Sequence, residues 1–101
     1  MKLEKKIQLK NMEHDREVVE RLVEENLTGK LDTYISKLDG EDREGEISLV
    51  VEQNKTSRFN GILNVSIDGK TFHYAREDYK SLADLINHLF DHLKESLADN
   101  K

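Results

Sequence analysis

The chain has 101 residues and a formal net charge of −5; 37% of its residues are charged, 36% are hydrophobic, and it contains no cysteine or proline. This length suits one core, so we expect residues 1–101 to form a single domain. The composition excludes disulfides and thiolate metal sites, and no run nears the roughly 20 apolar residues of a membrane span, so we expect a cytoplasmic protein without membrane contact.

The N-terminal third of the sequence predicts a strand followed by a long helix. Residues 5–11 alternate between polar and apolar side chains, as a half-buried strand does. Apolar residues then recur at three- and four-residue spacing, which predicts an amphipathic helix over residues 15–38. Gly29 interrupts that helix at a cost of about 1 kcal/mol relative to alanine, so a bend is possible there. Asp39 and Gly40 predict its end.

The remainder predicts three strands and a second helix. Apolar side chains occupy every second position at 47–51, 59–67 and 71–76. Asp68-Gly69 predicts a tight hairpin turn, since both central positions of such a turn need positive φ. Residues 82–97 carry leucine and other apolar residues at helical spacing, which predicts the second amphipathic helix.

The order of these elements predicts the architecture. A strand, a helix and a strand imply a parallel pair with a right-handed connection, and the two short turns imply an antiparallel meander. Each helix has one apolar stripe and each strand has one apolar face. Both helices should therefore cover one face of a four-stranded mixed sheet, in an α+β two-layer sandwich of order β-α-β-β-β-α.

The uncovered face of the sheet is expected to be exposed to solvent and to carry side chains of several polar kinds. It combines amides, hydroxyls and lysines, and two interpretations stay open: contact with phosphates, or an ordinary polar surface. The predicted members are Lys6, Gln8, Lys10, Ser48, Val50, Asn60, Ile62, Asn64 and His73.

The sequence has no pattern typical of catalysis. It lacks a nucleophile elbow, a Gly-rich phosphate loop and an HExxH motif, so we expect no enzyme, no cofactor and no small-molecule substrate. His88 and His92 have a spacing that suits a metal ion, but a further ligand would have to come from His73 or Asp91. We expect this histidine stripe to face solvent, and a solvated helix face is the favoured interpretation.

Three local patterns, together with the element order over roughly residues 5–97, carry a family resemblance. They are Lys30-Leu31 followed by Tyr34, Ile35, Lys37 and Leu38; Glu77-Asp78 followed by Tyr79 and Leu82; and Leu89 and Leu93 with Lys94. In these features the chain resembles a short member of the ribosome hibernation-promoting factor family, which includes the ribosome-associated inhibitor A type.

The resemblance implies a fold like that of double-stranded RNA-binding domains and a cytoplasmic, stress-related factor. Such a factor binds the small ribosomal subunit through its 16S-type rRNA and occludes the sites of messenger and transfer RNA. The RNA contacts that the resemblance carries over are Lys30, Lys37, Arg76, Lys80 and Lys94. Charge density in the sequence adds Lys6, Lys10, Lys55 and Arg58.

The distribution of charge leaves a second function open. Residues 13–39 carry eight acidic and four basic side chains, and the family usually has a basic residue where His88 stands. The alternative is an acidic protein-interaction module of the same fold, which binds a basic protein or itself and no RNA. A continuous basic patch would favour RNA, whereas lysines scattered among carboxylates would favour a protein partner.

Overall fold

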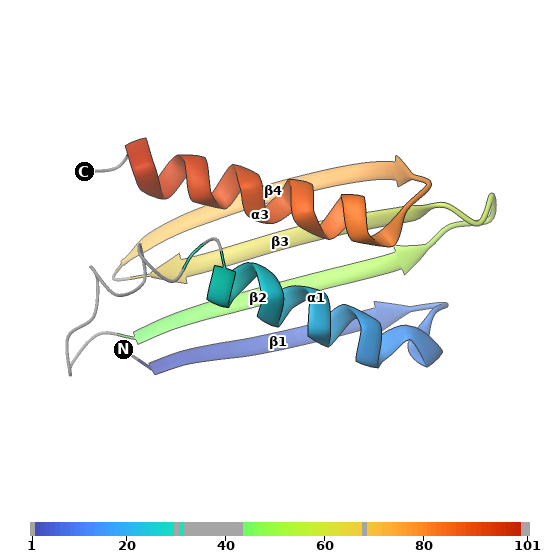
Figure 1. Ribbon diagram of the computed structural model, residues 1–101, viewed down its shortest axis with the longest axis horizontal. Helices are drawn as coiled ribbons and strands as arrows, with labels where there is room; N and C mark the ends of the chain where they lie inside the picture. Colours follow the sequence, from blue (N-terminus) through green and yellow to red (C-terminus); the bar gives the residue numbers. More distant parts are fainter. Residues whose placement is uncertain (1, 30, 32–43, 68, 100–101) are drawn as a thin grey trace.

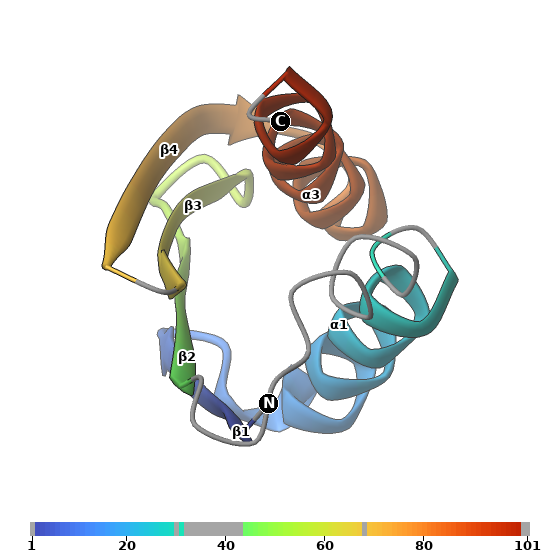
Figure 2. The same ribbon diagram turned by 90° about the vertical axis from the view of Figure 1, so that its left-hand side faces the viewer.

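The computed structural model describes residues 2–29, 31, 44–67 and 69–99, whose elements form two layers (Figures 1 and 2). The strands lie side by side in the order β1-β2-β3-β4, with β1 parallel to β2 and the other neighbours antiparallel. Both helices cover the same face of the sheet (Figure 2), which confirms the predicted α+β sandwich. The elements are β1 (Lys2–Lys10), a 3-10 turn (Glu13–Asp15), α1 (Arg16–Gly29), β2 (Glu44–Gln53), β3 (Phe59–Ile67), β4 (Lys70–Tyr79) and α3 (Leu82–Asp99).

The core lies between the sheet and the helices and follows from the two periodicities in the sequence. In β3 every second side chain from Gly61 to Ile67 is buried, while the residues between them are exposed. Fully burying one large aliphatic or aromatic side chain stabilises the fold by about 1.5–3 kcal/mol. The side chains with no measurable exposure include Met12, Val19, Leu49, Val51, Leu63, Leu85, Ile86, Leu89, Phe90 and Leu93.

The described part of the first helix is shorter than the sequence predicts. It ends at Gly29, and the Leu31 N–H donates to the Asn26 carbonyl oxygen at 3.2 Å, a bond typical of helix termination. Leu31 is buried beneath this end. The predicted continuation over 32–38 and its Asp39-Gly40 end lie outside the described residues. β1 and β4 begin earlier than predicted, and β4 also ends later, at Tyr79.

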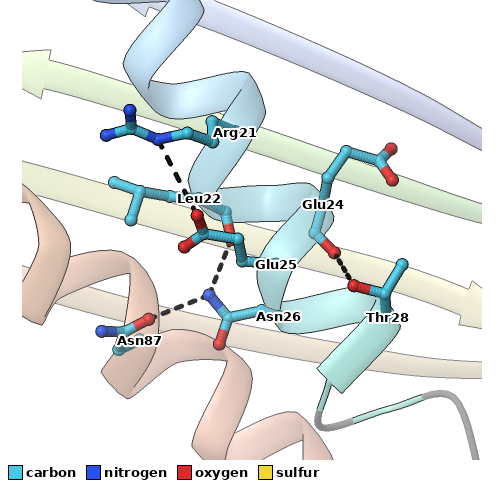
Figure 3. A network of polar contacts seen from close by, with 7 residues as sticks. All are labelled: Arg21, Leu22, Glu24, Glu25, Asn26, Thr28 and Asn87. Carbon is cyan, nitrogen blue, oxygen red and sulfur yellow. Dashed lines mark hydrogen bonds and ion pairs between the residues drawn. The ribbon is translucent and has the colours of Figure 1, made fainter.

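A polar contact joins the two helices inside the apolar layer (Figure 3). The buried Asn26 side-chain amide donates from Nδ2 to the Leu22 carbonyl oxygen at 2.8 Å and to Asn87 Oδ1 at 2.9 Å. Among the described residues, Asn26 Oδ1 has no hydrogen-bond partner, so only the Nδ2 group of this buried amide is satisfied. Because losing the Nδ2 bonds would add to the desolvation penalty, the Asn26–Asn87 contact favours one alignment of α1 against α3.

The closest approach of α3 to the sheet depends on a glycine in β3. A Cβ atom built on Gly61 would lie 3.0 Å from Leu89 Cδ1 and 3.1 Å from Leu85 Cδ2. Any side chain at this position would therefore push against two leucines that are fully buried. The absence of a Cβ lets the helix lie directly on the strand.

Gly61→Val is expected to lower the free energy of unfolding by about 1–3 kcal/mol, because its methyl groups overpack the Leu85 and Leu89 contact. Urea unfolding followed by far-UV circular dichroism measures the change. Gly29→Val is the matched control, since nothing lies within 4 Å of a Cβ at Gly29; its cost should stay under about 1 kcal/mol, the range of helix propensities. Equal stability of the Gly61 variant and the parent would contradict this packing.

Candidate functional site

Four exposed basic residues gather where β1, β2 and β4 end and β3 begins (Figure 1). Lys10 is the last residue of β1, and Lys55 lies in the turn between β2 and β3. Arg58 and Lys80 flank the last residue pair of β3 and β4, Phe59 with Tyr79. No ion pair joins any of these four side chains to another described residue. We call Lys10, Lys55, Arg58 and Lys80 the basic end of the sheet.

The turn that carries two of these cations is organised by Asn54. Its Oδ1 accepts hydrogen bonds from the Thr56 N–H at 3.0 Å, the Thr56 hydroxyl at 2.7 Å and the Arg58 N–H at 3.1 Å. Its backbone N–H donates to the Arg58 carbonyl oxygen at 2.8 Å, and Ser57 adopts a φ of 63°. An asparagine that bonds its own backbone in this way fixes the turn without help from the core. The structure thus has a short turn between β2 and β3, as the sequence predicts for the meander.

A bulge at the end of β4 connects this turn to the third strand of the meander. The register shifts between Phe59 and Gly61, so β4 holds one residue more than β3 there. Asp78 takes a φ of 59°, its N–H donates to Asn60 Oδ1 at 3.0 Å, and its carboxylate accepts from Asn54 Nδ2 at 2.8 Å. A bulge of this kind re-aims the strand and the residues that follow it. It thereby sets the place of Lys80.

Carboxylates lie close to the basic end, so its charge is mixed. Glu52 pairs with Lys10 of β1 in the sheet register. Lys10, Glu52 and Glu77 also line a shallow hollow of about 200 Å³, whose floor includes Ile62 and Ala75. The end is therefore neither one continuous basic patch nor a set of fully paired lysines.

The open face of the sheet contains the predicted residues in register. Lys6, Ser48, Asn64 and His73 form one row across the four strands. Lys6 is already paired, since its Nζ lies 3.1 Å from Glu46 Oε1. A lysine that is neutralised by a neighbouring carboxylate contributes little to attracting phosphate, so Lys6 is not part of the basic end. In the same row, His73 Nδ1 is hydrogen-bonded to Asn64 Oδ1 at 2.5 Å.

The other predicted RNA contacts do not gather with the basic end. Lys94 is exposed on α3, about 18 Å along the helix from its first residue at 1.5 Å per residue. Arg76 is half-buried on β4, where Nη1 donates to the Ala75 carbonyl oxygen at 2.8 Å and Nη2 is hydrogen-bonded to His92 Nε2. Lys30 and Lys37 lie outside the described residues.

His88 is exposed, as predicted for the stripe that it forms with His92, but His92 is half-buried, which the sequence did not predict. Both rings contact tyrosines of β4: His92 stacks on Tyr74 with ring centroids 5.9 Å apart, and His88 meets the ring of Tyr79 edge-on at 5.6 Å. The alternation of β4 pointed to this arrangement, because it places Tyr74 and Arg76 on the helix side of the sheet. Tyr79, which no sequence pattern explained, has its partner in His88. Among the described residues, no group of three or more histidine, aspartate or glutamate side chains is arranged to hold a metal ion.

The outer surface of α1 is acidic. Glu17, Glu20, Glu24 and Glu25 are all exposed, and part of their charge is balanced by ion pairs. These pairs join Lys5 with Glu24, Arg16 with Glu20 and Arg21 with Glu25. Exposed pairs of this kind are each worth only about 0–1 kcal/mol, so their main effect is on the local field rather than on stability.

Comparison with known proteins defines the class of fold. No family model matches the chain, and no curated protein sequence is significantly similar to it. Among solved structures, the chain is similar to the N-terminal domain of Protein Y from Thermus thermophilus, with a TM-score of 0.75, 22% sequence identity and coverage of 100% of both chains. At this identity the likeness shows the fold, which is the α+β fold of that domain. Neither described helix is long and apolar enough to cross a membrane.

Asn54→Ala is expected to lower the free energy of unfolding by about 1–3 kcal/mol, because it removes the acceptor for two backbone N–H groups and the link to Asp78. Lys55→Ala in the same turn is the control and should change stability by less than about 0.5 kcal/mol. Thermal or urea unfolding of both variants makes the comparison. Two equally stable variants would show that the asparagine does not organise this end.

Proposed function

We propose that this protein binds the small ribosomal subunit through rRNA and blocks the sites used by messenger and transfer RNA. The observation that carries the proposal is the basic end, where one cation ends β1 and three lie in the segments next to the ends of β2, β3 and β4, all exposed and without ion pairs to other described residues. The resemblance to the ribosome hibernation-promoting factor family supports it, because that resemblance implies the same β-α-β-β-β-α fold. The full-length likeness to the Protein Y domain supports it at the level of the fold.

The mechanism is occlusion and needs no covalent chemistry or cofactor. Lysine and arginine at the basic end would contact backbone phosphates and release the counterions that those phosphates hold. Such contacts fix the position of the protein but read no sequence. The two-layer body, held behind the contact, would then exclude other RNA from the same channel. We place this activity in the cytoplasm, under conditions in which ribosomes are idle.

The number of free cations limits the affinity. Each neutralised phosphate contributes roughly 0.7–0.9 to the slope of log affinity against log salt. The four cations of the basic end would therefore give a slope of roughly −3. The neighbouring carboxylates Glu52 and Glu77 reduce the local potential, so binding should be weak at physiological salt and strong at low salt.

The exposed carboxylates of α1 favour a second candidate function. A basic protein, or a basic segment of one, would meet Glu17 directly and would compete with Arg16, Lys5 and Arg21 for Glu20, Glu24 and Glu25, in that order. In this alternative the fold is retained as a protein-interaction module without RNA binding. The two functions use different surfaces, since α1 and the basic end share no residue.

Lys55→Gln combined with Arg58→Gln is expected to weaken binding to purified small subunits and to reduce the salt slope by roughly two units, about one for each lost phosphate contact. Co-sedimentation over a range of salt concentrations measures both quantities. Lys70→Gln is the matched control: Lys70 is exposed at the opposite end of the sheet, at the start of β4.

If the basic end is the binding surface, the double variant must bind small subunits more weakly than the control and with a smaller salt slope. Equal loss in both would assign the effect to net charge rather than to this site. If the parent protein does not pellet with small subunits at low salt, the ribosomal proposal is refuted. If the protein binds a basic protein, and Glu20→Gln combined with Glu24→Gln abolishes that binding, the alternative is established.

A further inference from the structure

The guanidinium of Arg76 is held against the protein by a histidine of the facing helix. Nη2 of Arg76 is hydrogen-bonded to His92 Nε2, and Nη1 donates to the Ala75 carbonyl oxygen at 2.8 Å. His92 is itself fixed, because its ring stacks on Tyr74 with an interplanar angle of 21°. The Tyr74 hydroxyl in turn donates to Ser96 Oγ at 2.5 Å, which fixes the tyrosine on α3.

This contact requires a neutral imidazole. Arginine has five N–H donors and no acceptor, so Nε2 of His92 must present its lone pair to Nη2. A proton on Nε2 turns the acceptor into a donor and places a second positive charge beside the guanidinium. The hydrogen bond cannot survive that change, and the two cations then repel each other.

Charged and titratable groups face His92 from both elements that pack around it. From β4, the charged or titratable neighbours are Arg76 and Tyr74. β3 faces them with Gly61 and Leu63, which carry no charge. On α3, the helical spacing places His88 and Glu95 on the same face as His92. A positive charge on His92 would be attracted by the Glu95 carboxylate and repelled by Arg76 and by a protonated His88.

We propose that His92 is a pH-controlled latch on Arg76, which withholds the guanidinium when the imidazole is neutral and releases it to an RNA phosphate when the imidazole is protonated. The inference rests on the proposed function, which supplies the phosphate. Arg76 lies on β4, four residues before Lys80 and on the other side of the bulge at Asp78. A released Arg76 therefore extends the basic end along β4.

The test compares the affinity for purified small subunits at pH 7.5 and pH 5.5 at constant ionic strength, a range in which imidazoles take up a proton. The wild type should gain roughly fivefold at pH 5.5, as expected for one added contact. His92→Gln keeps an oxygen acceptor for Arg76 but cannot be protonated, so its gain should be lost. His73→Gln is the matched control on the open face and should keep the gain. An undiminished gain in the His92 variant would overturn the latch.

A second measurement separates failure of the latch from failure of the proposed function. In an NMR titration of the free protein, the Arg76 side-chain Nε–Hε signal should shift together with titration of the His92 ring, and this coupling should vanish in His92→Gln. If the chemical shift of the Arg76 Nε–Hε signal stays constant while the His92 ring titrates, the latch is overturned. Coupling in NMR without subunit binding at either pH supports the latch and refutes the ribosomal proposal instead.

Discussion

The structure depends on two apolar helix stripes packing against one face of a four-stranded sheet. Leu85 and Leu89 of α3 pack closely on Gly61, where the strand has no side chain. Because α3 is fixed there, His88, His92 and Ser96 come to lie along β4 and contact Tyr79, Arg76 and Tyr74. The core thus determines which polar groups meet at the helix–sheet boundary and which are left to solvent.

Covering one face of the sheet leaves the open face and the strand ends for interaction. On the open face, Lys6 is neutralised by Glu46, and the rest of its row consists of Ser48, Asn64 and His73. The strand ends differ, because the Asn54 turn and the Asp78 bulge are held by polar bonds of their own. The four cations of the basic end lie beside this hydrogen-bonded turn and bulge. A fixed site loses less entropy on binding than a disordered one, which compensates in part for its small charge.

Most of the fold was predictable from the sequence. Alternation in the strands and three- and four-residue spacing in the helices follow directly from backbone geometry, so the element order and the covered face could be derived. The positive φ of Gly69, at 81°, fits the hairpin predicted at Asp68-Gly69, although Asp68 lies outside the described residues. The end of α1 at Gly29 was harder to predict, because a glycine within an apolar stripe costs only about 1 kcal/mol and does not by itself end a helix.

The candidate site was less predictable, since charge density along a chain does not say which cations have partners. Lys6 and Lys10 look equivalent in the sequence, yet within the described part of the chain Lys6 is paired with a carboxylate and Lys10 is not. The bulge at Asp78 left no sequence signal, because aspartate adopts positive φ only occasionally and for local reasons. Arg76 could have been assigned to the helix side by extending the alternation of Phe72 and Tyr74. Its contact with His92 required the packing of α3.

The most direct test of the account is a photo-cross-link from each of the two charged surfaces to isolated small subunits at low salt. A photoreactive side chain at Lys55 in the β2–β3 turn should cross-link to rRNA, and the same group at Glu17 on α1 should not. Cross-links to rRNA from position 17 alone, or from neither position, would contradict the claim that the basic end of the sheet binds the ribosome.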